Sequence, residues 1–96
     1  MFVAVSVFEL HLPQSRSLKN KRRVVKGLVD RLHERYRVSV AETDHHDLLQ
    51  RAEMAIAAVG RSEGELAELM ANLRRLIDEE HEAELLGWEP QILEGI

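Results

Sequence analysis

Six basic side chains lie close together near the start of the chain, within residues 15–26. They are Arg16, Lys19, Lys21, Arg22, Arg23 and Lys26. No acidic residue interrupts this segment, although the formal net charge of the whole chain is -4. Guanidinium and ammonium groups bind phosphate oxygens through charge-assisted hydrogen bonds. The segment therefore predicts a binding site for nucleic acid or another anion.

The spacing of these side chains places most of them on one face of a predicted helix. Ser17 is a good N-cap, and apolar residues recur at helical spacing after it, so we expect a helix from about residue 18 to residue 35. A basic ridge lies beside its apolar stripe and comprises Lys19, Arg22, Arg23, Lys26, His33 and Arg37. The helix dipole disfavours cations at this end of a helix. Anion binding and a merely solvated surface both remain open as explanations.

Other residue types with reactive side chains form no recognisable site. Asp44, His45, His46 and Asp47 include the ligand types of a zinc or nickel site, but adjacent residues in a turn rarely converge on one ion. We interpret them as a polar turn and expect no metal and no cofactor. Phosphate-binding loops and the common hydrolase motifs are missing from the sequence, so we expect a protein that is not an enzyme.

The order of the expected elements predicts the fold. We expect strands at about 2–12, 37–42, 49–60 and 85–94, and helices at about 18–35 and 63–81, with Ser62 and Glu65 forming a capping box. This β-α-β-β-α-β order is that of a ferredoxin-like α+β fold, with a four-stranded antiparallel sheet and both helices on one face. The first and third strands are central, and Pro90 restricts the last strand to an edge. The other sheet face lacks a cover. It is apolar along the first strand whether Val3, Val5 and Val7 face outward or the alternate set Phe2, Ala4, Phe8 and Leu10, which favours a homo-oligomer such as a dimer.

Length and composition are consistent with one compact domain over residues 1–96, since 45% of the residues are hydrophobic. The chain contains no Cys, which excludes disulfides and thiolate chemistry. The apolar N-terminus lacks the features of a signal peptide, and no segment is long enough to cross a bilayer. We therefore expect a soluble cytoplasmic protein.

Several segments in the same order along the chain resemble the YlxP-like family, the bacterial domain of unknown function numbered 503. They are SLKNKRRVVK at 17–26, VSVAE at 38–42, DLLQRA at 47–52 and EAELL at 82–86. The resemblance implies a ferredoxin-like fold and supplies no activity. Its genes often neighbour translation-initiation and ribosome-maturation genes, which implies ribosomal RNA or translation-related proteins as partners. Asn20 and Leu49 depart from the family, which usually has an acidic residue at the first position and often an aromatic one at the second.

Two functions from different classes follow from these observations. The first is a non-enzymatic binding module that contacts structured RNA, in particular ribosomal RNA, through phosphates and the basic helix face. The second is a protein-interaction or assembly module that uses the open sheet face without nucleic acid.

Overall fold

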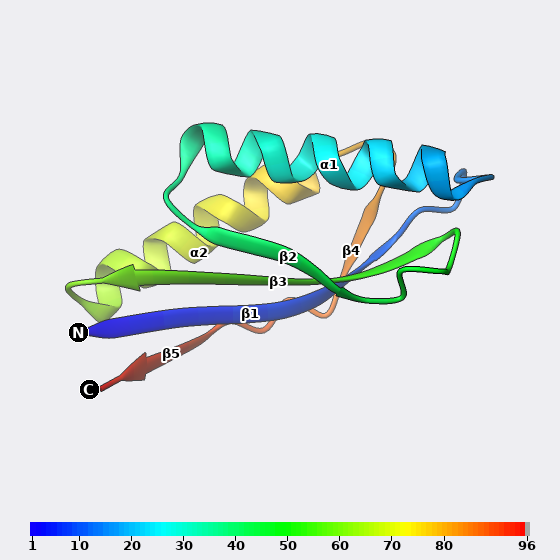
Figure 1. The fold of residues 1–96 in the computed structure, drawn as a ribbon. Helices are drawn as coiled ribbons and strands as arrows, with labels where there is room; N and C mark the ends of the chain where they lie inside the picture. Colours follow the sequence, from blue (N-terminus) through cyan, green and yellow to red (C-terminus); the bar gives the residue numbers. More distant parts are fainter. Residues whose placement is uncertain (96) are drawn as a thin grey trace.

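The computed structural model describes residues 1–95 and has two layers, a sheet below two helices (Figure 1). The sheet consists of β1 (Phe2–His11), β2 (Ser39–Asp44), β3 (Arg51–Gly60), β4 (Glu84–Leu86) and β5 (Gln91–Glu94). The helices α1 (Leu18–Arg35) and α2 (Glu63–Asp78) both cover the same face of the sheet. Neither helix is long and apolar enough to cross a membrane.

The strand order confirms the predicted fold. The strands pair antiparallel in the order β2-β3-β1-β4, and β5 also pairs with β1. The central pair runs through ten residue pairs, from Phe2 opposite Gly60 to His11 opposite Arg51. The sequence predicted β1 and β3 in the centre and two helices on one face, and this ferredoxin-like α+β arrangement is observed.

The last strand differs from the prediction, because the continuous strand expected at 85–94 is two short strands. Glu9 lies opposite Leu86, whereas Val5 lies opposite Gln91. Three residues of β1 (6–8) therefore face four residues (87–90), and the extra residue interrupts pairing as a bulge does. Gly87 has a φ of +70°, and Pro90 has no N–H to donate. At this interruption the ring centroid of Trp88 lies 5.2 Å from the ring centroid of Phe8.

The core lies between the sheet and the helices and follows from alternation along β1 and β3. Side chains at even positions of the two strands point toward the helices, as a period of two requires. They meet the apolar stripes of α1 and α2, whose N-caps are Ser17 and Ser62. The predicted bounds of α1 are correct, whereas α2 ends at Asp78 rather than near residue 81. β2 lies two residues later than expected, and β3 begins at Arg51 rather than near residue 49.

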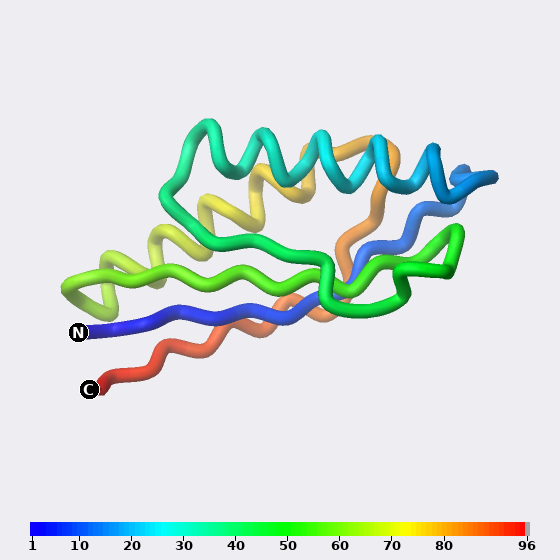
Figure 2. The backbone as a smooth tube through the Cα atoms, viewed as in Figure 1, coloured from blue at the N-terminus to red at the C-terminus, as the bar shows by residue number. Residues whose placement is uncertain are grey.

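The two ends of the described chain lie side by side (Figure 2). β5 pairs with the beginning of β1, and the backbone N–H of Gly95 donates to the carbonyl oxygen of Met1 at 3.0 Å. The start of α1 lies at the opposite end of the molecule from this pair. The predicted anion site and the paired ends are therefore well separated.

Candidate nucleic-acid interface

The segment that leads into α1 is held against the loop before β3. The backbone N–H of Leu12 donates to the carbonyl oxygen of Gln50 at 2.9 Å. In return, the Gln50 side-chain amide donates to the carbonyl oxygens of Pro13 at 3.2 Å and Ser15 at 3.3 Å. Ser15 is buried, and its hydroxyl donates to the carbonyl oxygen of Ser17. These contacts fix the point at which the helix begins.

Five of the six predicted basic side chains form one exposed surface there, which we call the basic stripe. It comprises Arg16, Lys19, Arg22, Arg23 and Lys26. On α1, Lys19 and Lys26 each lie three and four residues from Arg22 and Arg23, so the four helical members share a single helix face. Residues 12–29 contain no Asp or Glu. Within residues 1–95, Arg16, Lys19 and Arg22 have no ion-pair partner within 4.0 Å.

The helix start adds backbone donors to this surface. The Ser17 hydroxyl accepts from the N–H of Asn20 at 3.0 Å, and the first turn contains no acidic residue. The amides of Leu18 and Lys19 precede Lys21, whose N–H makes the first intrahelical hydrogen bond, to the carbonyl oxygen of Ser17, so they have no partner of that kind. A shallow hollow beside them is lined by Ser17, Lys19, Asn20 and Arg23. Free N–H groups and cationic side chains at one helix start are the donors that a phosphate group requires.

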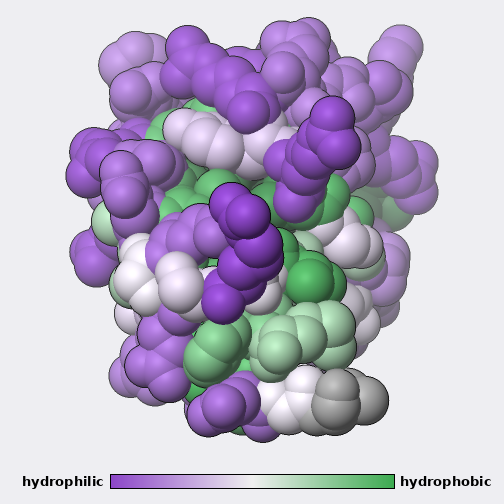
Figure 3. Space-filling model, turned by 90° about the vertical axis from the view of Figure 1, so that its left-hand side faces the viewer, coloured by the Kyte–Doolittle hydropathy of each residue, from purple (hydrophilic) through white to green (hydrophobic). Residues whose placement is uncertain are grey.

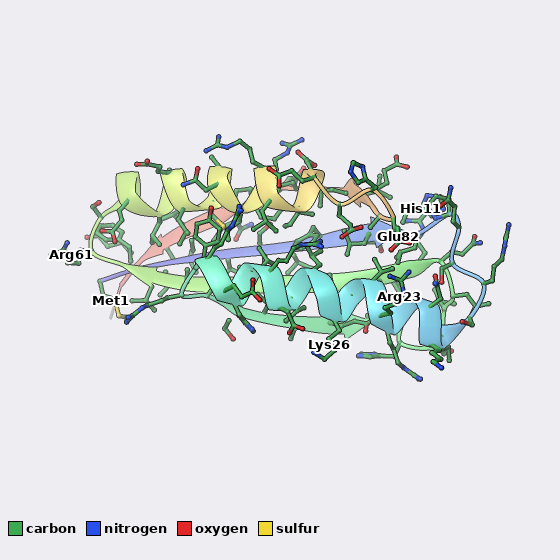
Figure 4. The ribbon with its side chains drawn as sticks, turned by 90° about the horizontal axis from the view of Figure 1, so that it is seen from above. Met1, His11, Arg23, Lys26, Arg61 and Glu82 are labelled. Atoms are coloured by element: carbon green, nitrogen blue, oxygen red, sulfur yellow. The ribbon has the colours of Figure 1, made fainter. Side chains whose placement is uncertain are left out.

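Two members of the basic stripe form exposed ion pairs. Arg23 Nη2 donates to both carboxylate oxygens of Glu82 at 3.0 Å, and in Figure 4 the two side chains lie at neighbouring positions. Lys26 Nζ lies 2.7 Å from Asp30 Oδ2, one helical turn further on. The hydrogen bond to Asp30 raises the pKa of Lys26. Exposed pairs of this kind contribute little to stability, so a polyanion can replace either carboxylate.

Lys21, which the sequence predicts as an anion-binding residue, does not lie on the exposed surface with the other five basic side chains. Its side chain is buried, with 1% of its area exposed. The ammonium group donates to the carbonyl oxygens of His45 at 2.5 Å and Leu48 at 2.8 Å, and it lies 3.1 Å from Glu42 Oε2. The contact with Glu42 is an ion pair without hydrogen-bond alignment, since that oxygen has no hydrogen-bond partner in the described structure.

A signal for this burial was present in the sequence. Lys21 precedes Val24, Val25, Leu28 and Leu32 by three, four, seven and eleven residues, which is the spacing of the core-facing stripe. Its long aliphatic chain can cross the edge of the core while the ammonium group finds carbonyl oxygens. Lys21 therefore anchors the loop between β2 and β3 beneath the start of α1.

The two remaining residues of the predicted ridge lie away from the basic stripe. His33 is exposed in the last turn of α1, two turns beyond Lys26. Arg37 follows Tyr36, the C-cap of α1, so it does not lie on the helix where the wheel had placed it. The backbone of Tyr36 is extended, and helical spacing no longer applies beyond it.

The Asp-His-His-Asp segment forms a turn whose main contact is with β1. His45 has a φ of 65°, and its ring Nε2 lies 3.1 Å from Glu9 Oε1. Arg51 Nη1 donates to the other Glu9 oxygen at 2.7 Å. The hydrogen bond with His45, followed by the charge of Arg51, lowers the pKa of Glu9. Among the described residues, no three His, Cys, Asp or Glu side chains cluster as metal ligands.

Comparison with known proteins identifies one family. The model of the family described as "Protein of unknown function (DUF503)" matches residues 3–89. That span covers every element except β5 and the first residue of β1, and it includes the whole basic stripe. A comparison with curated proteins gave no match.

Proposed function

Because the chain belongs to the DUF503 family of proteins of unknown function, we propose its function from its own surface: a non-enzymatic module that binds structured RNA. The basic stripe meets the phosphate groups of the RNA, and ribosomal RNA is the candidate that the gene neighbourhood of the family favours. The observation that carries this proposal is five exposed cations in a segment, residues 12–29, that contains no acidic residue. Contacts with phosphates position an RNA without reading its sequence.

The charge distribution supports a local contact and argues against coating of the whole protein by RNA. Residues 1–50 carry nine Lys or Arg against six Asp or Glu, whereas residues 51–96 carry four against eleven. A net negative protein repels a polyanion everywhere except at its basic surface. The described aromatic side chains give no stacking platform, because Phe8 and Trp88 pack against each other and Phe2 and Tyr36 pack against the core. Recognition therefore depends on the shape of the RNA backbone.

The salt dependence of binding tests this proposal. About four to six neutralised phosphates give a slope of log K against log[salt] of about -3 to -5. Fluorescence anisotropy with a labelled ribosomal RNA stem-loop measures the slope, and co-sedimentation with ribosomal subunits at two salt concentrations tests the natural target. In the Arg22→Glu/Arg23→Glu variant we expect weaker binding and a slope flatter by about two units.

A matched control separates the basic stripe from the net charge. Arg74→Glu/Arg75→Glu makes the same change in charge on α2, where both side chains are exposed. We expect this variant to keep the slope of the unmodified protein. Equal loss of binding in both double variants, or no loss of binding in the Arg22→Glu/Arg23→Glu variant, would show that the basic stripe does not bind the RNA.

A second candidate is a protein-interaction module, and the open sheet face favours it. In that case the basic stripe meets an acidic protein surface and RNA has no role. An RNA titration with no detectable binding at low salt, together with binding to an acidic protein partner, is the result that this alternative requires.

A further inference from the structure

The sheet face opposite the helices is divided into an apolar half and a charged half. The odd-numbered side chains of β1 and β3 point away from the helices, and the pairing aligns them in rows across the sheet. The apolar half comprises Val3, Val5, Val7, Ala55, Ala57 and Val59. Leu93 of β5 extends it, since it lies opposite Val3.

This apolar half reaches the surface. Val59 is 67% exposed, Leu93 55% and Val7 51%. Figure 3 views the molecule from the end with the two chain ends: polar side chains dominate the helix side at the top, and apolar ones reach the surface in the lower half. Single exposed apolar residues are ordinary, whereas a contiguous group on a flat sheet favours a partner.

The charged half begins one row further along the strands. Glu9 lies opposite Glu53, and His11 lies opposite Arg51. Glu9 is held by Arg51 and His45, as described above, and the Thr43 hydroxyl donates to Glu53 at 3.1 Å. These groups satisfy one another within the chain, so they offer no charged anchor for a foreign partner.

We propose that the apolar half docks against the same half of a second copy of this chain. The two-fold axis lies parallel to the sheet and perpendicular to the strands, along the row formed by Val5 and Ala57. This axis places the valines and alanines of one copy against those of the other. The same rotation turns the two charged halves to opposite ends, where they stay in water and avoid like-charge contact. An apolar centre with polar residues at its rim is the usual anatomy of a protein interface.

The size of the apolar half predicts a weak dimer. Five residues along the strands and four strands across span roughly 17 Å by 19 Å, or on the order of 300 Å² of flat area per copy. A stable interface needs about 800 Å² per partner, so we expect a weak dimer with a dissociation constant on the order of 100 µM. The proposal is independent of RNA binding, since the basic stripe lies on the helix side.

Sedimentation equilibrium at increasing concentration tests the dimer. We expect the average mass to rise from the 11.0 kDa of one chain toward twice that value as the concentration approaches about 1 mM. Ala57→Glu should abolish the rise, because it places two carboxylates at the axis. Ala71→Glu makes the same change on the exposed side of α2 and should leave the rise unchanged.

A milder pair of variants keeps the test valid even if Ala57→Glu does not fold. The chain has no Cys, so Ala57→Cys introduces one thiol per copy at the axis. A disulfide requires Cα atoms within about 7 Å, less than the spacing of about 10 Å between packed sheets, so a short bismaleimide is the appropriate cross-linker. We expect Ala57→Cys to form cross-linked dimers several-fold faster than Ala71→Cys. A monomer at every concentration, or equal cross-linking of the two variants, overturns the proposal.

Discussion

Lys21 shows at the scale of one residue how a basic side chain serves the fold instead of a ligand. We predict that Lys21→Met destabilises the protein by about 2 to 4 kcal/mol, because it removes two hydrogen bonds and leaves the Glu42 carboxylate without its cation. Chemical denaturation measures the loss. Lys19→Met, on the exposed side of the same turn, should change stability by less than about 0.5 kcal/mol.

A second variant identifies the origin of that loss. If the uncompensated carboxylate contributes, Lys21→Met/Glu42→Gln should recover part of the stability lost in Lys21→Met. Equal costs for Lys21→Met and Lys19→Met would show that the buried contacts of Lys21 are unimportant.

The ion pair of Glu80 with Arg31 leads to a prediction about how stability depends on pH. Burial by itself raises the pKa of Glu80, but hydrogen bonds from Arg31 and from the backbone N–H of Glu82 outweigh it, so the pKa is lowered from 4.5. A carboxyl with a lowered folded-state pKa stabilises the fold above its unfolded-state pKa, and this contribution is lost as the pH falls through the lowered value. Glu80→Gln should therefore destabilise the protein at pH 7, by at most about 1 kcal/mol since Arg31 is half exposed.

The difference in stability between the Glu80→Gln variant and the unmodified protein should shrink toward zero as the pH falls well below 4.5. Thermal unfolding between neutral and acidic pH measures it. Glu79→Gln is the control, because Glu79 is exposed and has no side-chain hydrogen bond or ion pair among residues 1–95. A difference that stays constant with pH would contradict the role of the Arg31 pair.

At the scale of the element, the start of α1 combines a good N-cap with an unfavourable charge. The Ser17 hydroxyl accepts from the N–H of Asn20, but the first turn has no acidic side chain to interact with the helix dipole. We predict that Asn20→Glu stabilises the free protein by about 0.5 to 1 kcal/mol, because it completes a capping box with Ser17. The same variant should bind RNA more weakly, since the new carboxylate lies beside the basic stripe.

Asn20→Gln distinguishes the two effects of Asn20→Glu. It offers the capping hydrogen bond without the charge, so we expect a smaller gain in stability and unchanged RNA binding. Denaturant melts and RNA titrations of the same preparations provide both quantities. If Asn20→Glu stabilises the fold and leaves binding untouched, the basic helix start is only a solvated surface.

At the scale of the whole molecule, the acidic second half of the chain touches the basic first half at one point of the proposed interface. Glu82 pairs with Arg23 across 59 residues of sequence. We predict that Glu82→Gln strengthens RNA binding and steepens the salt slope by up to about one unit, because Arg23 becomes available to a phosphate. Glu89→Gln removes the same charge at an exposed position of the strand interruption and should have a smaller effect. Anisotropy titrations with the same stem-loop compare the variants, and equal effects would indicate net charge alone.

Local patterns determined most of the elements. Ser17 and Ser62 cap their helices as predicted, and the near-alternation of apolar residues predicted β1 as a strand. Helical spacing also placed four members of the basic stripe on one face of α1. These features depend on residues within a few positions of one another, which is why the sequence is enough to predict them.

The tertiary structure decided which surfaces those elements present. The sequence left open whether the valines of β1 or the alternate set with Phe8 faces outward, and only packing of Ala4, Phe8 and Leu10 beneath the helices settled it. The interruption after Leu86 and the burial of Lys21 likewise depend on partners elsewhere in the chain, namely β1 and the loop after β2. Contacts of this kind form between residues that are close only after the chain has folded. Spacing along the sequence can therefore place Lys21 on the core-facing side of α1, but it does not identify the partners of Lys21 or of the interrupted strand.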